Sequence, residues 1–247
     1  MPIEIKSSRK ISAGDYDLNK WLFGGFDKDI ITTLYGPGGS GKTNFCMMVA
    51  VSQAKKGKKV IFIDTEGGFS VERVKQLGGG GYEEILKNIL LLKPTNFVEQ
   101  EESFDSLLKE IKKNEIGLIV VDGIAMLYRL ELAEARKKSR EEISQINSAL
   151  ARQLRILAEI SRKKDIPVIV TNQVYSEFLS DEEFRAGKEQ VMKMVGGDLL
   201  KYWSKCLIEL KHDNGKRTAF LRKHRSLREK EFSFEIIDSG IRKKGWI

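Results

Sequence analysis

The sequence predicts an α/β domain whose central sheet is mostly parallel and is flanked by helices. Four short apolar runs alternate with longer helical patterns, which is typical of βαβ units. Between the third and fourth runs, apolar residues recur at spacings of three and four from Ile143 to Ile160. This periodicity predicts one long helix that packs against the sheet. The four predicted strands span residues 30–35, 60–63, 118–121 and 168–171.

The C-terminal part of the chain has a different pattern. After Gly196 and Gly197, three short apolar runs are separated by turns, and Asp213-Asn214-Gly215 is a strong hairpin signal. We therefore expect the parallel sheet to continue into an antiparallel extension. The predicted strands of this extension span residues 206–210, 217–221 and 232–237.

The length of 247 residues suits one large domain. We expect a lead-in at residues 1–17, a core at 18–241 and a basic tail at 242–247. Four consecutive glycines at 78–81 predict a flexible connection, and residues 174–195 predict a long surface loop. Loops of that length in compact domains are usually functional or disordered.

The net charge is +8, and nearly all of the excess lies after Val120. Such an imbalance is expected if one face binds a polyanion, and it is equally consistent with a generally lysine-rich composition. The two cysteines, Cys46 and Cys206, have no metal-ligand spacing. The N-terminus lacks a signal-peptide pattern, and no stretch reaches the ~18 apolar residues of a membrane span. We expect a cytoplasmic protein with no membrane segment.

Residues 36–43 match the P-loop pattern G-x-x-x-x-G-K-[ST] completely, between a predicted strand and a predicted helix. Glycines let the backbone wrap phosphates without Cβ clashes, so that N–H groups point inward. Lys42 is expected to contact the β- and γ-phosphates, and the Thr43 hydroxyl to ligate Mg²⁺. The predicted cofactors are therefore ATP and Mg²⁺. The predicted nucleotide-binding residues are Gly36, Pro37, Gly38, Gly39, Ser40, Gly41, Lys42 and Thr43.

Polar residues follow three of the predicted strands, and the carboxyl ends of parallel strands meet at one crevice. Asp122 ends the third apolar run in a Walker B arrangement and is expected to hold Mg²⁺, directly or through water. Glu66 lies just beyond the neighbouring strand, where a carboxylate can act as a general base on the attacking water. An N-cap cluster for the next helix is the alternative, which suits Asp64 better than Glu66.

The Asp64-Thr65-Glu66-Gly67 sequence resembles the core of the RecA/RadA recombinase family, and other motifs follow in the family's order from about Leu18 to Ile241. The resemblance implies a RecA-like P-loop ATPase core. It implies that Glu66 is the catalytic carboxylate and that Gln173 senses the γ-phosphate and reports it to the DNA-binding loop that follows. It also implies that Arg73 packs on the adenine, although an exposed helix arginine is an alternative.

Within this family the chain most resembles the RadB group, the short archaeal paralogs of RadA. We expect no helical DNA-binding domain ahead of the core, and the residues before Leu18 contain no Phe-x-x-Ala polymerisation motif. Residues 223–226 stand where recombinases carry an Asp/Pro-containing ATP cap.

Residues 122–129 resemble the family's first DNA-binding loop, and residues 195–197 resemble the exit from the second. The basic residues after the first loop could contact phosphates or could form a solvated helix lead-in. Single strands are usually held by basic grooves with stacking aromatic side chains. The available aromatic residues, each of which could instead be core, are Tyr128, Tyr175, Phe178 and Phe184. The candidate DNA-binding residues are Arg129, Arg136, Lys137, Lys138, Arg140, Arg185 and Lys188.

Lys223 and Arg225 have the i, i+2 spacing that points two side chains to the same side of a predicted strand. A similar Lys-x-Arg in hexameric RecA-like ATPases such as KaiC and the DnaB helicase reaches the neighbour's γ-phosphate. We therefore expect both residues to act catalytically on the nucleotide of the next subunit. A basic strand edge that discourages aggregation is the alternative.

The leading hypothesis is a DNA-binding accessory factor of DNA repair and homologous recombination with weak, Mg-dependent ATP hydrolysis. The resemblance implies that it assists a RadA-type recombinase or a Holliday-junction nuclease on single-stranded or branched DNA, with possible self-association. Two alternatives are a KaiC-like ring-forming signalling ATPase and an ATP-switched adaptor with negligible turnover.

Overall fold

The computed structural model describes residues 9–176 and 192–245. Within them, a large sheet has the strand order β12-β11-β10-β9-β3-β7-β6-β4-β5, and β8 pairs with β7. Its strands are β3 (Ile31–Gly36), β4 (Lys59–Asp64), β5 (Ile89–Leu92), β6 (Ile116–Asp122), β7 (Val168–Ser176), β8 (Met192–Met194), β9 (Ser204–Asp213), β10 (Lys216–Lys223), β11 (Lys230–Ile237) and β12 (Gly240–Lys243). A two-stranded sheet joins β1 (Lys10–Ile11) and β2 (Phe26–Asp27).

The sheet has a parallel and an antiparallel part, as expected. Strands β9, β3, β7, β6, β4 and β5 run parallel, whereas β9 to β12 and the β7–β8 pair are antiparallel. The helices are α1 (Tyr16–Trp21), α2 (Lys42–Ala54), α3 (Val71–Gly78), α4 (Tyr82–Lys87), α5 (Phe97–Lys113), α6 (Met126–Ala135), α7 (Arg140–Lys164) and α9 (Gly197–Trp203). The predicted fold class is therefore confirmed.

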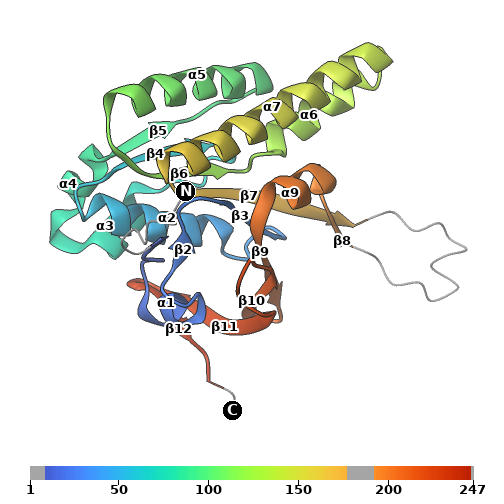
Figure 1. The fold of residues 1–247 in the computed structure, drawn as a ribbon. Coiled ribbons are helices and arrows are strands. Elements are labelled where there is room, and N and C mark those ends of the chain that lie inside the picture. Colours follow the sequence, from blue (N-terminus) through green and yellow to red (C-terminus); the bar gives the residue numbers. More distant parts are fainter. Residues whose placement is uncertain (1–8, 177–191, 246–247) are drawn as a thin grey trace, which may run out of the picture.

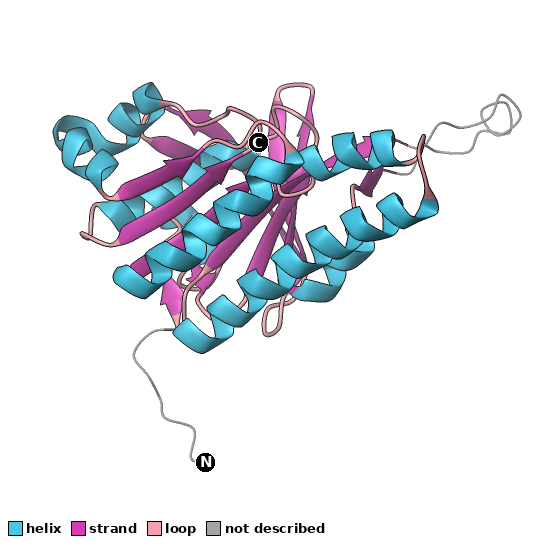
Figure 2. Cartoon of the chain, turned by 90° about the horizontal axis from the view of Figure 1, so that it is seen from above, coloured by secondary structure: helices cyan, strands magenta, loops and turns pink. Residues whose placement is uncertain are grey.

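Helices cover both faces of the parallel part, with α5 and α7 on one side and α2 and α3 on the other (Figure 1). The view from above shows the long helices lying over the sheet and running roughly along its strands (Figure 2). Alternate side chains of a strand point to opposite faces, so each central strand feeds two cores. In β4, Val60 and Phe62 pack on the α2 side, and Ile61 and Ile63 pack on the α7 side. Both faces of the strand are therefore buried, which explains its continuous apolar run.

The predicted long helix is α7, but only part of its apolar stripe is core. Leu150, Leu154 and Leu157 are fully buried against the sheet. Ile143 and Ile146 are half-buried. The first turns of α7 extend past the sheet and pack beside α6 instead (Figure 1). The prediction that the whole stripe packs against the sheet is wrong at this end, because periodicity does not report what lies opposite a helix.

The four glycines are not the flexible connection that we expected. Gly78 ends α3, and Gly79–Gly81 form a 3₁₀ turn that leads into α4. A Cβ on Gly78 would lie 2.8 Å from Ile85 Cδ1, so the absent side chain permits close packing of α3 on α4. The expectation also missed two edge strands. Strand β5 is only four residues long, and β12 contains Arg242, which we assigned to the basic tail.

Candidate nucleotide-binding site

The P-loop joins the carboxyl end of β3 to the start of α2. Gly36, Gly39 and Gly41 have φ values of 156°, 71° and 106°, which residues other than glycine rarely adopt. At Gly36 a Cβ would lie 2.0 Å from the carbonyl oxygen of Leu210. Pro37, Gly38 and Ser40 complete the loop. The glycines therefore permit a tightly wound loop, which fits the expected phosphate cradle.

Lys42 is the buried cation of this loop. Its ammonium group donates hydrogen bonds of 2.9 Å to the carbonyl oxygens of Gly36 and Pro37, and the residue is 5% exposed. Burial lowers the pKa of Lys42, and the nearby carboxylates of Glu66 and Asp122 offset only part of that effect. The Ser40 hydroxyl is buried with no hydrogen-bond partner among the described residues. A polyphosphate fits both features, since it offers Lys42 an anion and Ser40 an acceptor.

Thr43 and Asp122 lie together, as the proposed metal site requires. The Thr43 hydroxyl donates to Asp122 Oδ2 at 2.6 Å, and the Thr171 hydroxyl donates to Asp122 Oδ1 at 2.6 Å. Asp122 is fully buried, and burial raises the pKa of its carboxyl group. Hydroxyl and carboxylate oxygens suit Mg²⁺, which binds hard oxygen ligands. Thr171 was not predicted, because a threonine inside an apolar strand carries no local functional signal.

Glu66 follows the end of β4 and contacts Gln173 on β7. The loop that carries it is fixed by Asp64, whose carboxylate accepts hydrogen bonds from the N–H groups of Glu66, Gly68 and Phe69. Gln173 Nε2 donates to Glu66 Oε2 at 3.0 Å, while Glu66 Oε1 is buried without a partner in the described part of the chain. Gln173 therefore fixes one oxygen of the Glu66 carboxylate and leaves the other unpaired.

A glycine makes room for this carboxylate. Gly123 follows Asp122 and has a φ of 88°, and a Cβ there would lie 2.8 Å from Glu66 Cγ. The Thr65 hydroxyl also donates to the carbonyl oxygens of Asp122 and Gly123. Sequence reasoning missed Gly123, although a glycine directly after a Walker B aspartate was a usable signal.

Arg73 lies on α3 beside the first turn of α2. Its guanidinium donates to Asn44 Oδ1 at 2.9 Å and to the carbonyl oxygens of Ile237, Asp238 and Gly240. These bonds tie the β11–β12 turn to the start of α2, so Arg73 is not the exposed helix arginine that we considered. The expectation that it packs on adenine stays a prediction.

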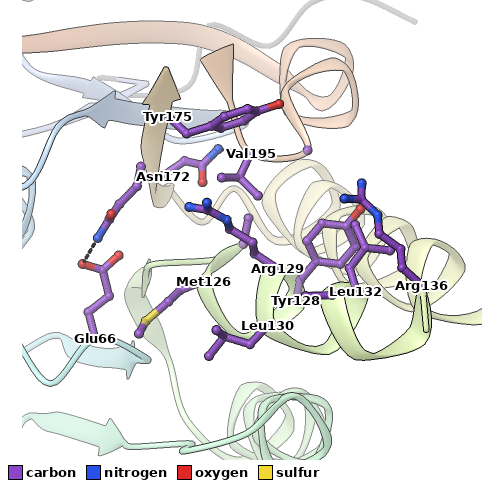
Figure 3. Close-up of a pocket in the computed structure, with 14 residues that line it drawn as sticks. Glu66, Met126, Tyr128, Arg129, Leu130, Leu132, Arg136, Asn172, Tyr175 and Val195 are labelled. Carbon is purple, nitrogen blue, oxygen red and sulfur yellow. Dashed lines mark hydrogen bonds between the residues drawn. The ribbon is translucent and has the colours of Figure 1, made fainter. Parts of the chain in front are cut away.

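A pocket of about 720 Å³ opens directly beside Glu66 and Gln173. Figure 3 shows Glu66 at one end and Arg136 at the other, with Arg129 between them. The Arg129 guanidinium lies 5.6 Å from the centre of the Tyr175 ring, which is a cation–π distance. Other lining residues include Met126, Tyr128, Leu130 and Asn172. The nucleotide site and a basic, partly aromatic pocket therefore share one wall.

The segment that resembles the first DNA-binding loop, residues 122–129, is a loop only in part. Asp122 ends β6, residues 123–125 form a turn and Met126 begins α6, so the expectation of a loop is wrong from Met126 onward. Tyr128 is 6% exposed and its hydroxyl donates to Asn147 Oδ1, which makes it core rather than a stacking platform. Tyr175 is 37% exposed and remains available.

The basic cluster after α6 is only partly available. Lys137 pairs with Glu134, and Lys138 pairs with Glu142. Arg140 is the exposed first residue of α7. Arg129 and Arg136 are exposed and line the pocket. The remaining residues of this prediction, Arg185, Lys188, Phe178 and Phe184, lie outside the described residues.

Lys223 and Arg225 lie at the edge of the sheet that is formed by the amino ends of the parallel strands. Their own P-loop lies at the opposite edge, which is formed by the carboxyl ends. Strand β10 ends at Lys223, so Arg225 is not on the strand, and the predicted i, i+2 arrangement is wrong. Lys223 Nζ donates to the carbonyl oxygens of Lys201 and Ser204. Arg225 donates two hydrogen bonds, of 2.8 and 2.6 Å, to the Asp29 carboxylate. Neither residue can serve the nucleotide of its own chain, and their action on a neighbour's nucleotide stays a prediction.

No helix among the described residues is both long and apolar enough to cross a membrane.

The chain matches known proteins over nearly its full length. The model of the Rad51 family matches residues 6–244. A protein of Methanobrevibacter smithii is 39% identical over 229 residues, which cover 91% of this chain and 92% of the relative. A protein of Methanothermobacter thermautotrophicus is 38% identical over 243 residues, or 96% and 97% of the two chains. Both relatives are described as DNA repair and recombination protein RadB. The chain therefore belongs to the Rad51 family of RecA/RadA proteins and is RadB-like.

Proposed function

We propose that this protein binds ATP and DNA and acts as an accessory factor in DNA repair and homologous recombination, with weak Mg-dependent ATP hydrolysis. The observation that carries the proposal is the hydrogen bond between Glu66 and Gln173. It lies on the wall that separates the P-loop site from the pocket of Arg129 and Tyr175. A change on either side of this wall can therefore reach the other through two side chains in contact.

The P-loop side supplies the chemistry of phosphate binding and hydrolysis. Bound Mg²⁺ would neutralise phosphate charge, and Thr43 and Asp122 are the residues that would hold it. Lys42 would leave its two carbonyl partners for the phosphates, because an anion is a stronger partner for an ammonium group. Glu66 would accept a proton from the attacking water through its free Oε1, while Gln173 holds Oε2 in place.

The pocket side supports nucleic-acid binding. Arg129 and Arg136 can neutralise backbone phosphates, and the exposed Tyr175 ring, with Arg129 across its face, offers a surface on which a base can stack. Family relatives named for DNA repair and recombination favour the same ligand. Single-stranded or branched DNA suits this site best, because an unstacked base can enter the pocket. The partner we propose is a RadA-type recombinase or a junction nuclease.

The test combines ATP hydrolysis with DNA binding. Single-stranded DNA should raise the hydrolysis rate, and DNA affinity should fall steeply with salt, because the site reads phosphates and not base edges. Arg129→Gln and Arg136→Gln should each lower the log–log salt slope by about 1. Lys163→Gln, at an exposed residue paired with Glu159 far along α7, is the matched control. A flat salt slope, or no DNA binding at all, would contradict the proposal.

One observation keeps a second candidate open. Lys223 and Arg225 lie on the edge opposite the P-loop, where a neighbouring subunit could meet them. A ring-forming, KaiC-like signalling ATPase with shared sites would use that arrangement and would need no DNA. A mass measurement with and without ATP, run alongside the hydrolysis rate with and without single-stranded DNA, separates the candidates, because a shared-site ring must assemble before it hydrolyses ATP and would need no DNA.

A further inference from the structure

The outer side of the P-loop rests on the antiparallel part of the sheet. Gly36 lies against the carbonyl oxygen of Leu210 on β9, and Gly41 faces Phe234 and Ile236 on β11. The crest of the loop, at Gly39, meets the remaining strand. There the Arg217 Nε–H on β10 donates a hydrogen bond of 3.2 Å to the Gly39 carbonyl oxygen. The strand that carries Arg217 is far from the P-loop in sequence, and no motif marks this residue.

This hydrogen bond fixes the orientation of the peptide group between Gly39 and Ser40. In a trans peptide, the C=O of Gly39 and the N–H of Ser40 point to opposite sides of the chain. A donor that holds the Gly39 oxygen on the outside therefore turns the Ser40 N–H toward the inside, where the loop cradles phosphates. Within the loop, the Ser40 N–H has only a long contact of 3.4 Å with the Pro37 carbonyl oxygen.

The crest also needs an external hold because it is made of glycine. Gly39 has a φ of 71°, and a Cβ there would find only His212 Nδ1 nearby, at 3.8 Å. A glycine with open space around it can adopt many backbone conformations, and fixing one of them costs more entropy than for other residues. A cationic donor on a paired β-strand supplies that constraint from a rigid element.

We propose that Arg217 is a positioning residue that orients the P-loop crest for phosphate binding. The inference rests on the proposed ATP binding and adds to it a residue outside every motif. Arg217 acts on the outer face of the loop and does not touch the nucleotide itself. Its loss should weaken ATP and ADP alike, since P-loop N–H groups cradle the phosphates common to both.

The experiment compares Arg217→Gln, Arg217→Lys and a control, Arg242→Gln. Arg242 is an arginine on the nearby strand β12, and its guanidinium is paired with the Glu235 carboxylate. We expect Arg217→Gln to weaken ATP and ADP affinity roughly fivefold to tenfold, the loss of one partly exposed charged hydrogen bond. The Arg217→Lys variant should recover part of the affinity, and Arg242→Gln should match the parent protein.

Steady-state kinetics add a readout that a merely structural role would not move. KM should rise in Arg217→Gln while kcat stays within about twofold, because the loop is misplaced before binding and correctly placed once occupied. Thermal melting without nucleotide should agree among the variants, and affinities measured well below the lowest melting temperature remove any effect of unfolding.

The outcomes separate this inference from the proposed function. If the parent protein and Arg242→Gln bind ATP and Arg217→Gln binds it equally well, the inference is wrong and ATP binding stands. An equal loss in Arg217→Gln and Arg242→Gln would also overturn it, because the effect would then be one of net charge. If the parent protein itself does not bind ATP, the proposed function fails.

Discussion

Lys42 and Arg225 are cations at opposite edges of the same sheet, and their hydrogen-bond partners differ in charge. At the P-loop edge, Lys42 is buried and bonded only to neutral carbonyl groups, and burial lowers its pKa. At the other edge, Arg225 is bonded to the Asp29 carboxylate, and that hydrogen bond raises the pKa of the guanidinium. Lys42 therefore lacks a bonded anion that Arg225 already has.

The pKa shifts of the carboxyl groups also differ between the two edges. Burial raises the pKa of Asp122, so its charged form is disfavoured at the P-loop edge. At the opposite edge the Arg225 hydrogen bond lowers the pKa of Asp29. Burial alone would raise the pKa of Asp27, but His224, Lys10 and Arg225 together lower it. Lys42 and Asp122 are both shifted toward their neutral forms, whereas Arg225 and Asp29 hold each other in their charged forms, so a charged ligand would gain most beside the first pair. Lys223 does not follow this division, because burial lowers its pKa as well.

The largest expected effect tests this contrast at Lys42. Lys42→Ala should reduce ATP affinity by at least about 100-fold, because no other residue among those described can supply this charge to the phosphates. The free energy of unfolding without nucleotide should change by less than about 1 kcal/mol, since a buried cation with neutral partners adds little stability. Equilibrium ATP binding and denaturant unfolding measure the two quantities. Parental affinity in the variant would contradict the P-loop assignment.

Glu66→Gln should separate binding from hydrolysis. An amide keeps the shape of the carboxylate and can still bond to Gln173, but it cannot accept a proton from water. We expect single-turnover hydrolysis to fall by about 10²–10⁴-fold with ATP affinity retained. An unchanged rate would mean that the water is activated by another group.

Local patterns predicted the parts of the site that local chemistry determines. The P-loop, Asp122, Glu66 and Gln173 each follow a predicted strand, and parallel strands bring their carboxyl ends to one edge. The contacts that Thr43, Thr171 and Gln173 make there follow from this topology. The same logic predicted the antiparallel extension, since a turn signal such as Asp213-Asn214-Gly215 acts over a few residues.

The rest of the site depends on contacts between distant segments. Tyr128 is an aromatic residue of the kind that can stack on a base, but it is buried and its hydroxyl donates a hydrogen bond to Asn147 on α7. The spacing of Lys223 and Arg225 predicts that both lie on one strand, but β10 ends at Lys223 and the Arg225 side chain forms an ion pair with Asp29. Gly123 and Arg217 act on Glu66 and Gly39 across the fold. Periodicity and motif spacing report nothing about partners this far away in sequence.

Asp122→Asn tests the comparison of the two edges through the pH dependence of the free energy of unfolding. The pKa of Asp122 is raised above its ordinary value of 3.8 by burial, so the stability it contributes is present below pH 3.8 and is lost as pH rises through the folded pKa. At pH 7 the nucleotide-free Asn variant should therefore be more stable than the parent, and the difference should shrink as the pH falls from the folded pKa of Asp122 toward 3.8. Mg-ATP should stabilise the parent and not the variant. Equal unfolding free energies across this pH range would show that the burial of Asp122 costs nothing.

The smallest expected effect concerns Arg225, and its direction is opposite. Arg225 lowers the pKa of Asp29 below 3.8, so this pair contributes stability above that pH and loses it as pH falls through the folded pKa of Asp29. Arg225→Ala should therefore lower the melting temperature at pH 7, and the difference from the parent should shrink in acid. Binding of ATP by the same chain should be unchanged, because the residue lies at the other edge. A melting curve at several pH values and one ATP titration test both statements.

The same variant decides whether the sheet edges meet across subunits. If Arg225 leaves Asp29 to reach a neighbour's phosphate, Arg225→Ala should hydrolyse ATP poorly, since such a guanidinium can be worth about 10³–10⁵ in rate. Mixing Arg225→Ala with Lys42→Ala should then restore part of the activity, because some interfaces pair an intact P-loop with an intact arginine. If the two chains assemble but the mixture stays inactive, or if Arg225→Ala alone retains parental activity, Arg225 serves only the stability of its own chain. Its ion pairs with Asp27 and Asp29 are then its whole role, and the two edges differ as a binding site and a structural contact.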